Sequence, residues 1–180
     1  MTKIQQSLTI NAPLEAITAY ASDPCHMPVW NQMIARVWDV QAAPEVVGTT
    51  WQVAVKVMGS EQHVVARISS YEAPRRFGIE LVGGAPGMPG LQATLEMEVK
   101  PARSAAPGSS HLASREAAPS AAAPDSGSAQ VVCTLHLRVP LRVGGSALGA
   151  LISPVISEQL RHGLLDLKRV LEAHQRGTGG

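Results

Sequence analysis

The sequence predicts an α+β domain in which helices cover one side of a curved, seven-stranded antiparallel sheet. Segments of alternating apolar and polar residues recur along the chain, and such alternation is typical of strands with one buried and one solvated face. Two short helical patterns follow the first of these segments, and a long apolar repeat with helical spacing ends the chain. A length of 180 residues suits one domain, which we place at residues 1–176 with a flexible tail at 177–180.

The first strand is followed closely by the short helices. In residues 3–10 the apolar side chains share one face with Gln6, so this glutamine is expected to point inward. Residues 11–13 end in a proline, which favours the first turn of a helix, and a short helix is predicted after them. Residues 24–33 predict a second short helix or an irregular turn, because Pro28 limits its regularity.

Six further segments are predicted as strands in meander order. All but one have a clear inward face; in residues 34–41 both registers carry apolar side chains, so either face can be the buried one. A hairpin turn is expected at residues 58–60 and a glycine- and proline-rich loop at 83–90. The predicted strands are residues 34–41, 50–57, 62–70, 77–81, 91–100 and 131–139.

The last predicted element is a long amphipathic helix. Ser153 and Pro154 have the residue types of an N-cap and a first helical position, and apolar residues then repeat at helical spacing as far as Leu171. In the alternative, the helix begins near Ala147 and bends at Pro154. Gly163 lies on the apolar face, where its missing side chain allows either close packing on the sheet or room for a ligand.

Residues 101–128 differ in composition from the strands on either side of them. Alanine, serine, proline and glycine occupy 22 of these 28 positions. Such a segment buries too little apolar surface to offset the entropy of ordering it. We therefore predict a disordered insertion between the last two strands, which is either neutral or a partner-binding segment.

Composition narrows the class of protein. Charged residues make up 16% of the chain and the formal net charge is +1, which argues against non-specific nucleic-acid binding. No apolar run reaches the roughly 18–20 residues of a membrane span, so no integral membrane association is expected. With two cysteines and no apolar stretch typical of a signal peptide at the start, we expect a cytoplasmic protein.

The alternation also predicts where chemistry can occur. On the assigned faces, every carboxylate, histidine and basic residue of the strands points outward, so the inward face is almost entirely apolar. General acid–base catalysis needs a titratable group in reach of the substrate, whereas an apolar cavity with a few neutral polar groups is typical of ligand binding. A small hydrophobic molecule is thus the expected partner.

Candidate ligand-binding residues follow from this inward face. Large polarisable side chains grip apolar ligands, although the same residues also serve as plain core. Tyr20 and His26 are expected near the mouth of the cavity, and Asp39 becomes a general base only if residues 34–41 adopt the less favoured register. His162 either reaches the cavity or lies on the helix surface. The predicted site comprises Trp30, Trp51, Val55, Met97, Gln62, Gln159 and Tyr20.

The sequence lacks the motifs of metal binding, phosphate binding and serine-hydrolase catalysis. The histidines lack HxxxH and HExxH spacing, neither cysteine belongs to a CxxC pair, and the glycine-rich loop precedes a strand rather than a helix. No G-x-S-x-G serine nucleophile motif is present. We expect no metal and no cofactor.

Several segments resemble one known superfamily. They are SLTINAPLEAITAYASDPCHMPVW (residues 7–30), Gly48 before a strand, ISSYEAPRRFGIEL (residues 68–81) and LLDLKRVLE (residues 164–172). They are similar to the START-like, or SRPBCC, superfamily of helix-grip proteins, and the resemblance covers residues 1–100 and 129–173. This superfamily includes polyketide cyclases and aromatases, pollen-allergen-like carriers, lipid-transfer domains and a co-chaperone branch.

The resemblance implies a helix-grip fold, in which the curved sheet wraps around the long C-terminal helix. It implies binding of an aromatic, polyketide-like or lipid molecule in an internal apolar cavity. One alternative is a polyketide cyclase, aromatase or dehydratase-type enzyme that works without a metal, and a second is a co-chaperone-like protein-interaction module. One scaffold supports all of these functions, so the motifs specify the fold better than the activity.

Overall fold

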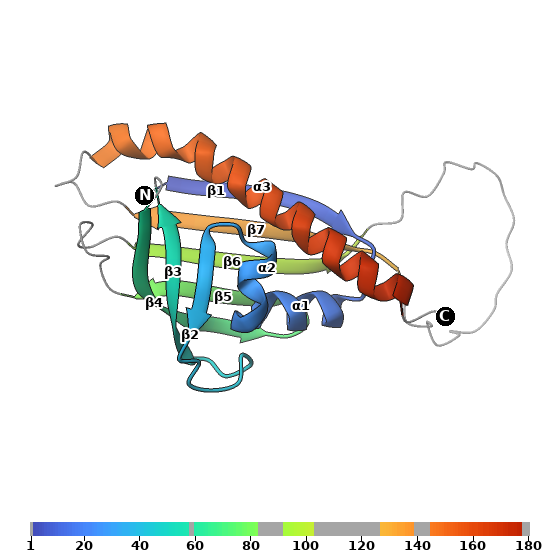
Figure 1. Cartoon of the computed structure of the whole chain (residues 1–180). Helices are drawn as coiled ribbons and strands as arrows, with labels where there is room; N and C mark the ends of the chain where they lie inside the picture. The colour runs from blue at the N-terminus through green and yellow to red at the C-terminus, as the bar shows by residue number, and fades with distance from the viewer. Residues whose placement is uncertain (1, 58–59, 83–91, 103–126, 139–144, 178–180) are drawn as a thin grey trace, which may run out of the picture.

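A computed structural model describes residues 2–57, 60–82, 92–102, 127–138 and 145–177 (Figure 1). The predicted hairpin turn at 58–60 and the glycine-rich loop at 83–90 fall mostly or wholly outside these residues, as does most of the predicted insertion. Along the described chain, no helix combines the length and the apolar character needed to cross a bilayer.

One seven-stranded sheet forms the body of the protein, with strand order β1-β7-β6-β5-β4-β3-β2. Every neighbouring pair is antiparallel, which confirms the predicted fold class. The strands are β1 (Thr2–Ile10), β2 (Ile34–Trp38), β3 (Thr50–Val57), β4 (Ser60–Glu72), β5 (Arg76–Val82), β6 (Gln92–Pro101) and β7 (Ala129–Arg138).

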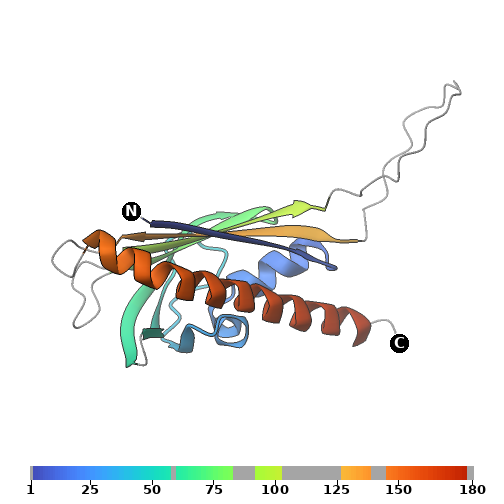
Figure 2. The ribbon, with the colours of Figure 1, turned by 90° about the horizontal axis from the view of Figure 1, so that it is seen from above.

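The helices lie on one side of this sheet, as Figure 2 shows. Between β1 and β2 the chain forms α1 (Leu14–Ser22), the 3₁₀ turn η1 (Pro24–His26) and α2 (Met27–Trp30). The long helix α3 (Gly145–Gly177) follows β7 and runs beside β1 in the same direction. The predicted pair of short helices after the first strand and the long helix at the end are confirmed.

The start of α3 differs from our main expectation. The helix begins at Gly145, close to the alternative start near Ala147, and Pro154 lies inside it. Proline at an interior position removes one backbone hydrogen bond, a loss that a helix of 33 residues tolerates. Ser153 and Pro154, although they have the residue types of a helix start, therefore lie inside the helix.

Gly163 allows two helices to approach each other. A Cβ atom at this position would lie 2.9 Å from the carbonyl oxygen of Trp30, closer than non-bonded atoms of this kind approach. The glycine is thus required for packing, as expected, but the contact is with α2 rather than with the sheet. The alternative that Gly163 leaves room for a ligand is wrong, because the Trp30 backbone occupies that space.

The orientation of β2 is set by an irregularity in its pairing with β3. The register shifts between Ile34 and Arg36, after which Trp38 pairs with Gln52 on the outer face. In this register Val37 pairs with the inward Val53, so continued alternation would turn Asp39 inward. The strand ends at Trp38 instead, and Asp39, with a φ of 53°, is exposed and is not an inward general base.

Candidate functional site

The inward face of the sheet is apolar, as the alternation predicts. On the described strands, none of the side chains that face α3 is an aspartate, glutamate, histidine, lysine or arginine. The outward face carries ion pairs, such as Arg67 with Glu80 at 2.7 Å and Arg76 with Glu96 at 3.4 Å. Complete burial raises the pKa of the Cys133 thiol to about 12, so this inward group stays protonated.

Exposure along the inward face is uneven. Two rows of residues that pair across neighbouring strands keep some contact with solvent. In the first row Leu95 and Leu135 are half-buried, and Ile4 and Ile79 lie on either side of them. In the second row Leu81 is half-buried. We call these the open rows; they are Ile4–Leu135–Leu95–Ile79 and Leu137–Ala93–Leu81.

The adjacent row, on the side of Ile4 that leads toward Gln6, is fully buried at its centre. Phe77, Met97 and Cys133, which pair with one another across β5, β6 and β7, are all 0% exposed. Gln6 continues this row onto β1, where its Nε2 donates a hydrogen bond to Ser157 Oγ at 2.7 Å. Further along, Lys168 Nζ donates to the Thr9 carbonyl oxygen, so β1 and α3 run in the same direction. The open rows therefore lie toward the N-terminal part of α3.

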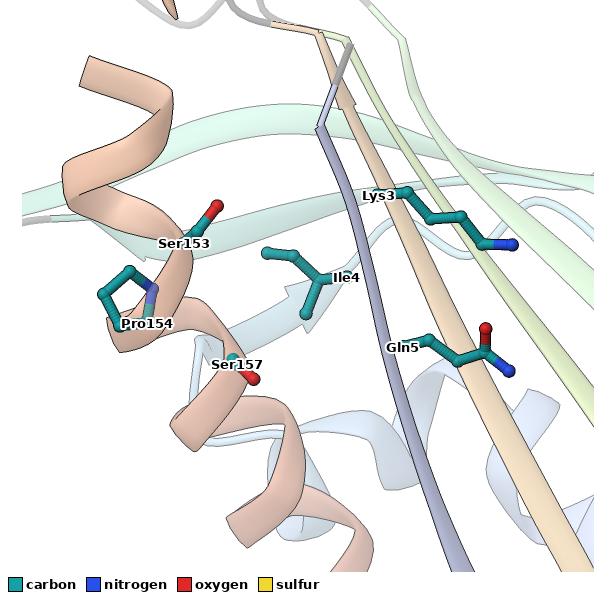
Figure 3. A pocket seen from close by; sticks show the side chains of 6 residues that line it. All are labelled: Lys3, Ile4, Gln5, Ser153, Pro154 and Ser157. Atoms are coloured by element: carbon teal, nitrogen blue, oxygen red, sulfur yellow. The ribbon is translucent and has the colours of Figure 1, made fainter. Parts of the chain in front are cut away.

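A depression of about 360 Å³ lies between β1 and α3 at this end of the molecule (Figure 3). Ile4 points toward the helix, which presents Ser153 and Ser157, whereas Lys3 and Gln5 point to the opposite side of the strand. The depression is open to solvent and is not the enclosed apolar cavity that we expected. Its polar wall and apolar floor make it suitable as an entrance rather than as a closed binding site.

A second depression lies on the outward face of the sheet. It has a volume of about 290 Å³ and is lined by charged groups of both signs, among them Lys3, Arg76, Glu96 and Glu98. Lys3 and Gln5 line both depressions.

Four of the predicted site residues lie in one buried hydrophobic cluster. Trp30 and Trp51 are each 1% exposed, Met97 is fully buried, and Val55 keeps slight exposure. Gln62 is half-buried and pairs with Val55 across β3 and β4, so both side chains face inward. The pairing thus brings one polar side chain to the edge of this cluster.

The remaining candidates lie elsewhere. Tyr20 stacks on His26 with ring centroids 4.2 Å apart, and His174, near the C-terminal end of α3, lies 6.2 Å from the same ring. This end is opposite to the open rows. Burial, and then the charge of Asp23, raises the pKa of Tyr20. Gln159 is half-buried on α3, whereas His162 is exposed and contacts the Glu158 carbonyl oxygen, as its surface alternative predicted.

Sequence reasoning missed two features of the interior. Ser157 is the polar partner of Gln6, and its only sequence signal was its place one turn after Ser153 on the same helix. The indole nitrogens of Trp30 and Trp51 are both buried, and neither has a hydrogen-bond partner among the described residues. These two tryptophans were predicted as ligand-binding residues because of their apolar surface, and nothing in the sequence pattern indicated that their N–H groups would lack partners.

Solved structures share this fold over nearly the whole chain. The Zhui aromatase/cyclase from Streptomyces sp. R1128 is 14% identical, with a TM-score of 0.69 over 99% of this chain and 98% of that one. A START superfamily protein from Mycobacterium smegmatis is 17% identical, with a TM-score of 0.64 over 95% and 97% of the two chains. At such identities the likeness establishes the fold alone.

Sequence comparison identifies the family. No protein of curated function matches the chain. The model of the family described as polyketide cyclase / dehydrase and lipid transport matches residues 1–172. This match and the helix-grip arrangement of the sheet and α3 agree with the START-like resemblance of the sequence motifs. The chain belongs to the polyketide cyclase / dehydrase and lipid transport family.

Proposed function

We propose that this protein binds a small, uncharged hydrophobic molecule between the open rows of the sheet and α3. The observation that carries the proposal is the partial exposure of Leu81, Leu95 and Leu135 beside a row, Phe77–Met97–Cys133, that is fully buried. Apolar surface left in contact with water costs about 25 cal/mol per Å², so a ligand that covers these leucines gains free energy from their burial. The family description, which names polyketide chemistry and lipid transport, supports the same ligand class.

The depression between β1 and α3 is the proposed entrance. It lies beside Ile4, the first residue of one open row, and the Gln6–Ser157 hydrogen bond crosses the gap between strand and helix at its inner end. Neutral hydroxyl and amide groups at this entrance can contact a polar end of the ligand without demanding a charge on it. The buried cluster of Trp30, Trp51 and Met97 would form the inner wall of the site.

A binding role is favoured over catalysis by the chemistry of the inward face. Cyclisation and dehydration of a polyketide need groups that move protons, and the described inward side chains of the strands supply no carboxylate, imidazole or amine for this purpose. A site of this composition would hold and shape a ligand. The cyclase alternative would have to rely on positioning by neutral groups.

Replacing Leu135 with glutamate is expected to weaken binding of the neutral fluorescent probe N-phenyl-1-naphthylamine by more than about tenfold. No described inward side chain of the strands is a cation that could pair with a carboxylate among the open rows, so covering this carboxylate with an apolar probe carries a large desolvation cost. Fluorescence titration of the purified full chain gives the dissociation constants, and circular dichroism checks that the variant is folded.

His136→Glu is the matched control, because His136 is the next residue of β7 and points outward. It introduces the same charge on the same strand and should leave probe binding unchanged. Equal weakening by both substitutions, or no saturable binding to the wild-type protein, would refute a binding site on the inward face.

A further inference from the structure

Pro154 divides the long helix α3 into two parts. It lies in the interior of the helix, and because proline has no backbone N–H, the carbonyl oxygen of Ala150 loses the donor that would bond to it in a continuous helix. Prolines inside helices are a common site of bending for this reason. Residues 145–153 are thus joined to the rest of α3 less firmly than the residues of an uninterrupted helix would be.

The part of α3 that follows Pro154 is anchored to the rest of the protein. Ile156 is the first of the described α3 side chains to be buried, and Gly163 packs against the backbone of Trp30. Hydrogen bonds to other elements join Ser157 to Gln6, Asp166 to Gln32, Lys168 to Thr9 and Glu172 to Asn11. The anchoring contacts of the described side chains therefore begin just after the proline.

The two parts of α3 lie opposite different rows of the sheet. The hydrogen bond between Gln6 and Ser157 aligns the helix with the row that is fully buried at its centre. A strand advances about 3.3 Å per residue and a helix about 1.5 Å, so two residues back along β1 correspond to about four residues back along α3. Ile4 of the first open row therefore lies opposite Ser153, and both line the depression between β1 and α3 (Figure 3).

The second open row lies opposite the part of α3 that precedes Pro154. Leu137 of this row pairs with Thr2, so the same spacing places it opposite about residue 149 of the helix. The helix also extends past the start of β1 (Figure 1). Pro154 thus separates the anchored helix, which lies over the buried row, from the helix that lies over the accessible rows.

We propose that residues 145–153 form a hinged cover of the binding site, which turns about Pro154 to admit and release the ligand while the rest of α3 stays in place. This inference rests on the proposed function and adds how access to the site is controlled. When the cover turns away from β1, the depression beside Ile4 widens across both open rows. The Gln6–Ser157 hydrogen bond holds the helix just beyond the hinge, so the movement does not spread along α3.

Pro154→Ala is expected to slow both the binding and the release of N-phenyl-1-naphthylamine at least about fivefold. Alanine restores the backbone hydrogen bond to Ala150 and favours the helix more than proline does, so the cover opens less often. The closed protein is stabilised equally with and without the probe, so the dissociation constant should change by less than about twofold. Stopped-flow fluorescence of the purified full chain measures both rates.

Val155→Ala is the matched control, because it changes the neighbouring exposed residue and leaves the backbone hydrogen bonds of the helix as they are. Both rates should keep their wild-type values in this variant. Probe binding with wild-type rates in Pro154→Ala would overturn the hinged cover while leaving the proposed binding function standing. A wild-type protein that shows no saturable binding of the probe would overturn both.

Hydrogen exchange followed by NMR tests the hinge without any ligand. In the wild-type protein the backbone amides of residues 149–153 should exchange at least about tenfold faster than those of residues 157–161. Pro154→Ala should reduce this difference, and Val155→Ala should not. Equal exchange on the two sides of Pro154 in the wild-type protein would show that the helix opens as one unit and would overturn the hinged cover.

Discussion

Replacing Gly163 with leucine is expected to lower the free energy of unfolding by about 3 kcal/mol or more. A Cβ atom here would lie 2.9 Å from the Trp30 carbonyl oxygen, a backbone atom that cannot rotate away, so α2 and α3 must separate. Overpacking of this kind commonly costs about 1–3 kcal/mol, and the longer leucine side chain adds further strain. Urea denaturation followed by circular dichroism measures the change.

Gly163→Ala separates this contact from helix propensity. Alanine stabilises a helix by about 1 kcal/mol relative to glycine, so a net loss of stability in this variant reports the clash with Trp30 directly. Gly177→Ala in the same helix has no atom within 4 Å of the new methyl group and should not destabilise the protein. An alanine at 163 that stabilises the fold would show that α2 and α3 are not in obligatory contact.

The buried thiol of Cys133 is expected to make the protein progressively less stable above pH 9. Its pKa rises from 9.0 to about 12 on burial, so between these values the unfolded chain releases a proton that the folded chain retains. Unfolding is then favoured as the pH increases, and the contribution of the thiol to stability is fully present below pH 9 and lost toward pH 12. The total effect is about 4 kcal/mol, or about 1.4 kcal/mol per pH unit.

The measurement is the difference in unfolding free energy between the wild-type protein and Cys133→Ala from pH 8 to pH 11. Other groups that titrate in this range contribute equally to both proteins, so the difference isolates Cys133. Cys25→Ala is the control, because Cys25 is exposed and its removal should change the slope much less. Parallel curves for wild type and Cys133→Ala would mean that the inward face tolerates a thiolate, contrary to the apolar site proposed here.

Much of the fold follows from local patterns. Alternation in β6 and β7 assigns Met97 and Cys133 to the buried face, and the same parity places Gln6 inward on β1, where it meets Ser157. These predictions succeed because the side-chain period of a strand is fixed by backbone geometry, so burial of one face determines the other. The apolar character of the candidate site was predictable for the same reason.

Other properties depend on how distant elements meet. The shift in β2 pairing arises from a single irregular step that no periodicity reveals. The end of the strand at Trp38, which leaves Asp39 exposed, is likewise not marked in the alternation. The sequence indicated that Gly163 would make a close contact but gave no sign that its neighbour is Trp30, a residue on another helix.

The amino-acid sequence alone determined the fold class, the order of the elements and an inward face free of charge, because each follows from residue types and their local spacing. The tertiary structure decided which part of that face stays accessible and which polar atoms lack partners. Those depend on packing between β1, α2 and α3, whose contacting residues lie far apart in the chain. The partly exposed leucines and the unpartnered indoles of Trp30 and Trp51 are products of that packing.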